Sequence, residues 1–454
     1  MGIRLKKLKG KGTFPRGVHP PGRKEISADK KIEIMPTPGM VLLPLLQNIG
    51  APCKSIVKPK QTVTFGEKIA ESGEYISASI HSPISGTVLK ETTTTLPNGR
   101  HVQALPIQKE GPQVEGQDLW DRLYGGEWPK KFDGKFSPAE ITDKITASGI
   151  VGLGGAAFPT HVKIVPNDKK PVDTLLVNGC ECEPYLTTDY RLMVEAPGPI
   201  ISGSILGGIA TGAKDIIICI EDNKPEAIRT IQKAAENTHI QIAALKTKYP
   251  QGSERHLIKA VSGRTMPLGK LPADVGIAVS NVGTIAAVAD AVLRDLPLTH
   301  RFVSVTGGGI KNPKNLLVPI GTPYGDIIEY CGGLAEDACV VMSGGPMMGF
   351  AFTDFTMPVT KGTSGVTVLT KKDTKKAKET ACIRCGLCVD VCPMHLVPTR
   401  LATAARHRNM DLAEKYNIMA CMESGCCAYI CPANIQLVQL IRMGKAMVMA
   451  NRKN

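Results

Sequence analysis

The order of hydrophobic and polar residues changes character along the chain, and each change predicts a different kind of unit. Residues 52–110 alternate β-branched and polar residues, with turn signals at 65–67, 72–73 and 97–99, which predicts a small all-β unit. From residue 173 the pattern predicts strands at 173–177, 215–220 and 240–245 and helices at 200–213 and 225–237. Strands that alternate with helices indicate a parallel sheet covered on both faces.

The pattern changes again after residue 300. Short strands at 301–306 and 317–320 and a helix at 324–331 are expected there. The lysine-rich stretch 371–378 then predicts a solvated linker. With 454 residues the chain is too long for one core and should hold about three or four domains.

The residues after this linker contain two cysteine runs. The first is Cys382-x-x-Cys385-x-x-Cys388-x-x-x-Cys392-Pro393, and the second holds Cys421, Cys426, Cys427 and Cys431-Pro432. Such tandem runs are typical of a pair of [4Fe–4S] clusters, in which the proline-marked cysteine of each run binds the other cluster. The expected sets are Cys382, Cys385, Cys388 and Cys431 for one cluster and Cys392, Cys421 and Cys427 for the other. A zinc ribbon fits less well, because its cysteine pairs lie a dozen or more residues apart.

The second run is imperfect, since Ser424 stands where a perfect copy has cysteine. Three alternatives follow: Cys426 takes the corner, Ser424 binds through oxygen, or the second cluster is labile or contains three irons. Cys426 is favoured because a soft thiolate suits iron better than a hydroxyl.

Composition and charge narrow the class of protein. No run of eighteen apolar residues and no signal peptide is found, so a cytoplasmic protein is expected. Eight of the 14 cysteines lie in the two runs and the others form no extracellular disulfide pattern.

The net charge is +14, and eight basic residues without an acidic one lie within the first 24 positions. This arm suits an anionic membrane surface or an acidic partner, with a solvated tail as the alternative. Nucleic acid is not expected, because no aromatic residues are interleaved to stack bases.

A glycine-rich loop precedes the first strand of the α/β pattern. It contains Gly152, Gly154 and Gly155, followed by Lys163, and backbone N–H groups of such a loop can hold a phosphate. That strand ends at Asn178-Gly179-Cys180-Glu181-Cys182-Glu183, at the edge of a parallel sheet where ligands bind. Carboxylates there suit ribose hydroxyls or an amide, and the Cys180–Cys182 pair leaves a metal site as a minor alternative.

Several strings resemble known families. Residues 80–88, Ile-His-Ser-Pro-Ile-Ser-Gly-Thr-Val, resemble the biotinyl/lipoyl hammerhead, although its tip at 74–79 has no carrier lysine. The glycine loop, the string from Asn178 and Ser280-Asn281-Val282-Gly283-Thr284 resemble the FMN/NADH-binding subunit of respiratory complex I. The hammerhead and the glycine loop occur in the same order in the C subunit of the Rnf electron-transport complex, together with residues 17–21, the string 249–254 and the cysteine runs. The chain resembles that family over essentially its whole length.

The resemblance implies a multidomain α/β fold. Its expected parts are a basic arm and lead-in (1–50), a lipoyl-like β hammerhead (51–112), a Rossmann-like FMN/NADH domain (113–300), a β-grasp SLBB domain (301–365) and an α-helical two-[4Fe–4S] ferredoxin domain (366–454). The resemblance also implies site residues. The residues that would contact FMN are Gly152, Gly154, Gly155, Lys163, Asn178 and Asn281. Phe158 would stack on the nicotinamide. Glu181 and Glu183 would hold NADH.

The function that the resemblance implies is electron transfer between NADH, FMN and two [4Fe–4S] clusters, in a membrane-bound, ion-translocating ferredoxin:NAD⁺ oxidoreductase. The implied place is the cytoplasmic face of the membrane, as a peripheral subunit beside other subunits, one of them of ferredoxin type. Two alternatives remain: a cobalamin reductase of the propanediol-utilisation type, and a non-catalytic iron–sulfur scaffold.

Overall fold

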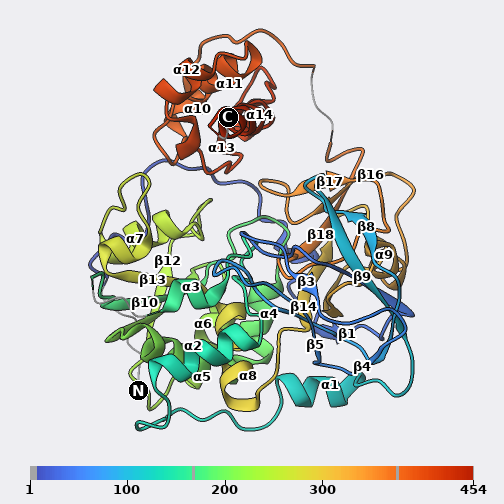
Figure 1. Cartoon of the computed structure of the whole chain (residues 1–454). Coiled ribbons are helices and arrows are strands. Elements are labelled where there is room, and N and C mark those ends of the chain that lie inside the picture. The colour runs from blue at the N-terminus through green and yellow to red at the C-terminus, as the bar shows by residue number, and fades with distance from the viewer. Residues whose placement is uncertain (1–7, 166–168, 375–377, 453–454) are drawn as a thin grey trace.

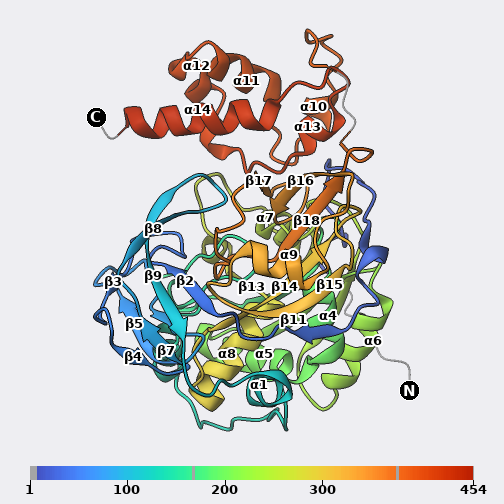
Figure 2. The ribbon, with the colours of Figure 1, turned by 90° about the vertical axis from the view of Figure 1, so that its right-hand side faces the viewer.

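The computed structural model describes residues 8–165, 169–374 and 378–452. These residues form a β unit, a parallel α/β unit, a second β unit and a C-terminal helical unit. The helical unit, coloured red, lies at one end of the molecule in both views, and the other units form the body beneath it (Figures 1 and 2). The fold class expected from the sequence is therefore confirmed.

The first β unit contains two small antiparallel sheets. One has the strand order β2-β9-β7-β4 with β8 beside β9, and the other has the order β3-β5-β6. Their bounds are β2 (Met40–Pro44), β3 (Lys54–Ser55), β4 (Thr62–Val63), β5 (Lys68–Glu71), β6 (Ile80–His81), β7 (Gly86–Val88), β8 (Thr92–Thr95) and β9 (His101–Lys109). Because β2 pairs with β9 along its whole length, the unit includes residues before the boundary expected at 51.

The α/β unit has a four-stranded parallel sheet. Its order is β12 (Gln241–Leu245), β11 (Asp215–Glu221), β10 (Thr174–Gly179) and β13 (Ile277–Asn281). Near-continuous apolar runs form these strands because helices cover both faces of the sheet. The chain moves from β10 to β11 and β12 on one side and then returns to place β13 on the other side of β10. A topological switch point therefore lies between β10 and β13, where open α/β sheets bind ligands.

The helices of this unit divide between the two faces of the sheet. A large core joins α5, α6 and α8 to one face, and a smaller core joins α7 to the other. A Ser137–Glu140 capping box begins α2. The bounds are α1 (Gly116–Leu123), α2 (Pro138–Ala147), α3 (Thr160–Ile164), α4 (Thr188–Glu195), α5 (Pro197–Thr211), α6 (Pro225–Ala234), α7 (Glu254–Ser262) and α8 (Val282–Arg294).

The second β unit is a six-stranded mixed sheet packed against helix α9 (Tyr324–Tyr330). Its order is β1 (Ile32–Ile34), β15 (Lys314–Pro319), β14 (His300–Thr306), β18 (Gly365–Thr370), β16 (Ala338–Ser343) and β17 (Phe350–Phe352). The edge strand β1 comes from the N-terminal lead-in and pairs in parallel with β15. This sheet therefore also differs from the expected boundaries, since β18 continues past residue 365.

The helical unit carries both cysteine runs. Its helices are α10 (Leu387–Asp390), α11 (Pro398–Arg406), α12 (Met410–Lys415), α13 (Cys426–Ile430) and α14 (Leu437–Asn451). The short helices α10 and α13 each follow a glycine in the left-handed conformation. Helices α11 and α14 pack together around Leu401 and Ile441.

The described part of the basic arm is packed against the body. Gly10 N donates to Val261 O (2.9 Å), and Val18 pairs with Tyr249 in an isolated bridge. Gly17 N donates to Val391 O (3.0 Å), so this segment also contacts the helical unit. The solvated-tail alternative therefore does not hold for residues 8–24. The basic residues Arg4, Lys6 and Lys7 lie outside the described residues.

No single helix in the described ranges is long and apolar enough to cross a membrane. Helices α4 and α5 reach the required length and composition only together, across a bend of 97°.

Candidate functional site

Two asparagines mark the switch point of the parallel sheet. Asn178 lies near the end of β10 and Asn281 ends β13, and they are partners in the strand register. Asn281 Nδ2 donates to Asp189 Oδ2 (2.7 Å) and to Asn178 O (3.4 Å), while its Oδ1 accepts from Gly283 N (2.8 Å) and caps α8. Asn178 Nδ2 donates to Gly252 O (2.8 Å). Both side chains predicted for the flavin site therefore meet at one sheet edge.

The glycine-rich loop lies over this edge. Gly152 N donates to Phe158 O (2.8 Å), which closes the loop at its base, and Leu153 N donates to Thr284 Oγ1 (2.8 Å). Gly154 and Gly155 are exposed, and Phe158 is half-buried. A Cβ added at Gly154 would lie 3.5 Å from Asn281 Cβ, so the loop and the asparagine are neighbours. This exposed backbone over a sheet edge suits a phosphate-bearing cofactor.

Helix α3 begins two residues after Phe158 and carries Lys163. Lys163 Nζ forms an ion pair with Glu254, at the start of α7. Near the start of α3, His161 Nε2 bonds to the carbonyl of Tyr75, which lies in the tip region of the hammerhead (3.0 Å). The tip thus contacts the helix that follows the glycine loop.

The buried Glu181 faces inward from the strand end. Its Oε1 accepts from Asp189 N (2.7 Å) and its Oε2 from Tyr190 N (3.3 Å), so the carboxylate caps α4. Lys24 Nζ lies 4.0 Å away. Burial raises the pKa of Glu181, and burial together with Glu181 raises the pKa of Asp189 to about 7.

Glu183 contacts a different unit. Its Oε1 accepts from Met347 N (2.6 Å) and Met348 N (3.2 Å), which belong to the loop between β16 and β17. Burial raises the pKa of Glu183 to about 7, although the two backbone donors favour the charged form. The sequence places both carboxylates at the sheet edge, and the structure adds that each accepts hydrogen bonds from backbone N–H groups, Glu181 from α4 and Glu183 from the loop between β16 and β17.

Two lysines that sequence reasoning did not select hold this region together. Lys24 Nζ donates to Leu186 O (2.6 Å) and Glu183 O (3.1 Å). Lys224 is fully buried, and its Nζ donates to Cys180 O (2.6 Å) and lies 3.3 Å from Glu221 Oε2. In the sequence, Lys24 is one of the eight basic residues of the N-terminal arm, and that pattern predicts surface charge and not a buried contact.

The two cysteines of the acidic string are packed rather than clustered with other ligands. Cys180 is buried, and the Cys182 sulfur accepts from Gly252 N (3.3 Å). Burial raises the pKa of both thiols. Throughout the described residues, no three His, Cys, Asp or Glu side chains are grouped so as to hold one metal ion.

The first predicted set of cluster ligands lines one cavity. Its members, Cys382, Cys385, Cys388 and Cys431, come from both cysteine runs, as the crossed pattern requires. Cys382 and Cys385 are exposed, so this cavity is near the surface. Four sulfurs around one cavity fit the donor set of an iron–sulfur cluster.

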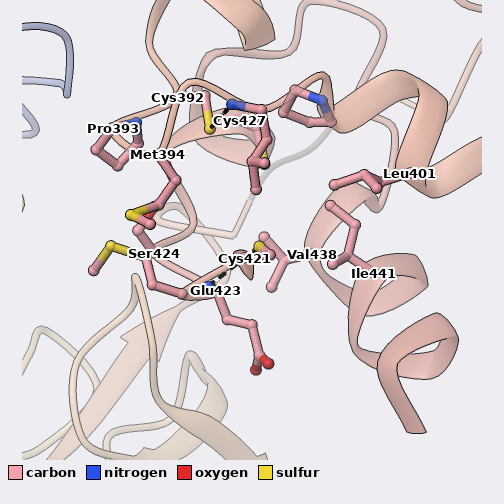
Figure 3. Close-up of a pocket in the computed structure, with 13 residues that line it drawn as sticks. Cys392, Pro393, Met394, Leu401, Cys421, Glu423, Ser424, Cys427, Val438 and Ile441 are labelled. Atoms are coloured by element: carbon pink, nitrogen blue, oxygen red, sulfur yellow. Dashed lines mark hydrogen bonds between the residues drawn. The ribbon is translucent and has the colours of Figure 1, made fainter. Parts of the chain in front are cut away.

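The second cavity lies closer to the body of the molecule, between α11, α14 and the loop before α13 (Figure 3). Its lining includes Cys392, Cys421 and Cys427 together with Ser424. Cys426, which the sequence favoured for the fourth corner, does not line this cavity. It is fully buried among Val18, Tyr249 and Met347 instead. The reason is the backbone register, since Cys426 is the first residue of α13 and Ser424 precedes the left-handed Gly425.

Two side chains of the α/β unit contact both cysteine runs directly. Tyr249 Oη donates to Ser424 O (2.7 Å), and His256 Nε2 bonds to Pro393 O (3.1 Å). The sequence identified the string that contains Tyr249 only as a family feature and did not select His256. These contacts join the sheet edge to the second cavity.

Comparison with protein-family models assigns each unit to a class. Residues 145–290 match the Nuo51 FMN-binding domain, 12–112 the RnfC barrel sandwich hybrid domain, 302–351 the SLBB domain and 379–435 the 4Fe-4S dicluster domain. The fold and the site thus define a protein that joins an FMN-binding domain of the complex I type to a two-cluster ferredoxin domain.

Whole-chain relatives extend this class to a family. The chain is 44% identical to the C subunit of the proton-translocating ferredoxin:NAD(+) oxidoreductase complex of Clostridium ljungdahlii, over 96% of this chain and 93% of the relative. It is 42% identical to the C subunit of the Na(+)-translocating complex of Acetobacterium woodii, over 97% and 98%. The chain therefore belongs to the RnfC family, the C subunits of ion-translocating ferredoxin:NAD⁺ oxidoreductase complexes. A solved NAD⁺-reducing [NiFe]-hydrogenase shares the fold at a TM-score of 0.50 and 21% identity, over 70% of this chain and 66% of that chain.

Proposed function

We propose that this chain is the NAD(H)-facing electron-transfer subunit of a membrane-bound, ion-translocating ferredoxin:NAD⁺ oxidoreductase. One observation carries the proposal: the segment 249–252 of the α/β unit joins the switch point to the second cysteine cavity, because Asn178 Nδ2 donates to Gly252 O and Tyr249 Oη donates to Ser424 O. A flavin site and a cluster site are thus parts of one packed structure, as a relay requires.

FMN is held at the switch point in this proposal. The exposed backbone of Gly154 and Gly155 would take the phosphate, with Gly152 at the closed base of the loop and Lys163 as a nearby positive charge. Asn178 and Asn281 would contact the flavin. When bound, FMN supplies the exchange between a two-electron donor and one-electron carriers. The chain's own residues orient the cofactor, and Lys163 forms an ion pair with Glu254 at the start of α7.

The nucleotide side of the site is assigned to Phe158 and Glu183. Phe158 is half-buried beside the exposed glycines, where its ring can stack on a nicotinamide. Glu183 would accept from a ribose hydroxyl or an amide; its Oε1 already accepts from Met347 N and Met348 N, and Tyr249 is a further side-chain partner. Glu181 acts indirectly, because both of its oxygens cap α4.

In this proposal one cluster lies next to the α/β unit and the other lies nearer the surface of the molecule. Cys392, Cys421 and Cys427 would hold the cluster next to the α/β unit. Cys382, Cys385, Cys388 and Cys431 would hold the outer cluster.

The outer cavity is the entry or exit point for electrons. It is lined by Arg384, Arg400, Arg406 and His407, and this basic rim suits an acidic iron–sulfur partner, here a ferredoxin-type subunit of the same complex. We place the chain at the cytoplasmic face of the membrane as a peripheral subunit, with ion movement in partner subunits.

Anaerobic purification with iron, sulfide and flavin analysis tests the proposal. About eight irons and one FMN per chain, with bleaching on addition of NADH, support it. Brown protein without flavin that NADH does not bleach would identify a structural scaffold instead. Co-purification with microcompartment proteins and reduction of cobalamin would favour the cobalamin reductase alternative.

A further inference from the structure

The two cysteine runs share one backbone conformation. Arg384 and Glu423 have positive φ angles of 57° and 59°, and two residues later Gly386 and Gly425 both have φ 81°. Each glycine is followed directly by a short helix, α10 or α13. The two loops therefore align without insertion or deletion.

This alignment assigns each residue of the second run a counterpart in the first. Ser424 corresponds to Cys385, and Cys426 corresponds to Leu387. Leu387 does not line the first cavity, and 40% of its surface is exposed. The position that Cys426 occupies therefore does not line the cavity in either run, although the Cys426 thiol bonds to the Ser424 side chain.

The register of the second run is fixed at Gly425. Its φ of 81° is unfavourable for residues with a side chain, and an added Cβ would lie 2.6 Å from Met347 O. To reach the position of Ser424, Cys426 would have to shift by two residues, and Cys427 would then stand at the position of Gly425, which a side chain does not fit. The neighbouring carbonyl of Ser424 is held by Tyr249 Oη, and Glu423 is held by Arg442 (2.9 Å) and Lys445 (2.5 Å) of α14.

We propose that three thiolates, Cys392, Cys421 and Cys427, hold the second cluster, that the Ser424 hydroxyl stands at its fourth corner, and that Cys426 is not a ligand. This inference rests on the proposed function, because it requires a cluster in the second cavity. The Ser424 side chain lines that cavity, whereas Cys426 is enclosed by Val18 and Tyr249.

The arrangement makes one iron of the second cluster different from the others. A hydroxyl is a poorer ligand for the iron of a cluster than a thiolate, so this iron is released more readily. Removal of one electron from a [4Fe–4S]²⁺ core by ferricyanide and loss of one Fe²⁺ leave a [3Fe–4S]⁺ core, which electron paramagnetic resonance detects.

The experiment compares three forms of the full chain, purified anaerobically and treated with limiting ferricyanide. The wild type should release about one of its roughly eight irons and develop the three-iron signal. Ser424→Cys should retain all its iron and show little of this signal. Cys426→Ala should behave as the wild type, and unchanged flavin content in each variant verifies the fold.

The proposal is overturned if Cys426→Ala loses the second cluster, or if Ser424→Cys releases iron as readily as the wild type. Failure of the proposed function would look different: flavin would be absent, or NADH would not bleach protein that contains both clusters. The two results can therefore be distinguished in the same preparations.

Discussion

At the scale of single residues, Gly154 offers the sharpest test of the flavin site. A Cβ there meets nothing closer than 3.5 Å and its φ is not positive, so the fold tolerates a side chain. The methyl groups of Gly154→Val should cover the exposed loop and abolish FMN binding, which fluorescence after denaturation measures. Iron content should stay unchanged. Gly39→Val is a matched control, because no atom lies within 4 Å of its Cβ, its φ is not positive, and it lies beside β9 in the first β unit. Loss of iron together with flavin would indicate misfolding and contradict a local effect.

Glu183 allows a prediction about pH. Its pKa is raised from 4.5 to about 7 in the folded protein, mainly by burial. Between these values the folded state binds more protons than the unfolded state, so this group's contribution to stability falls as the pH rises. Glu183→Gln should therefore flatten the decline of thermal stability between about pH 4.5 and 7, measured by differential scanning fluorimetry. The same substitution should raise the KM for NADH and leave FMN content near one per chain. An unchanged pH profile would show that this carboxylate does not titrate there.

The residues of the second cysteine run show where sequence reasoning reaches its limit. Ligand softness favoured Cys426, and spacing alone could not show which way that thiol points. The proposal against Cys426 uses the left-handed conformation of Gly425 against Met347, a contact between residues far apart in the sequence. Asn178 and Asn281 were identified only through a family resemblance, because their register pairing depends on the strand order.

At the scale of elements, three of the four strands of the parallel sheet, β10, β11 and β12, were predicted within about two residues, because buried parallel strands are short apolar runs between turn signals. Strand β13 was not predicted. The strands of the N-terminal lead-in were not predicted in this way. Strand β1 pairs with β15 and strand β2 with β9, and such distant partners leave no local pattern. The boundaries expected at residues 51 and 365 therefore differ from the sheets.

The N-terminal segment leads to a prediction at this scale. Residues 8–24 contact both the α/β unit and the helical unit, through Gly10, Arg16 and Gly17. Removing residues 1–24 should loosen the helical unit, lower the melting temperature and accelerate its release by limited proteolysis. Removing only residues 1–7, which include Arg4, Lys6 and Lys7, should weaken membrane association in a salt-sensitive way, at about 1 kcal/mol per basic residue. Equal stability losses for both truncations would contradict this division of roles.

At the scale of the whole molecule, the hammerhead acts as a support in this structure. Lys361, which follows β17 in the second β unit, is almost fully buried, and its Nζ donates to Ser79 O and Gly149 O (both 2.6 Å). Burial lowers the pKa of Lys361 to about 7. One side chain thus connects three units, and the tip at 74–79 meets α3 rather than presenting a carrier lysine. Intact-mass measurement should find no lipoyl or biotinyl adduct, and an adduct mass would contradict a supporting role.

The order of the sites predicts the order of reduction. The glycine loop lies at the sheet edge, the second cavity is joined to that edge through Tyr249 and His256, and the first cavity lies at the surface. In anaerobic stopped-flow measurements at low NADH, loss of flavin absorbance should therefore precede loss of iron–sulfur absorbance. Both phases should slow in Glu183→Gln, because the proposed function assigns this carboxylate to the nucleotide. Gly154→Val is the control, since without flavin the clusters should accept electrons from dithionite but not from NADH. If NADH fails to reduce the flavin in wild-type protein that dithionite reduces fully, electrons must enter elsewhere and the relay is excluded.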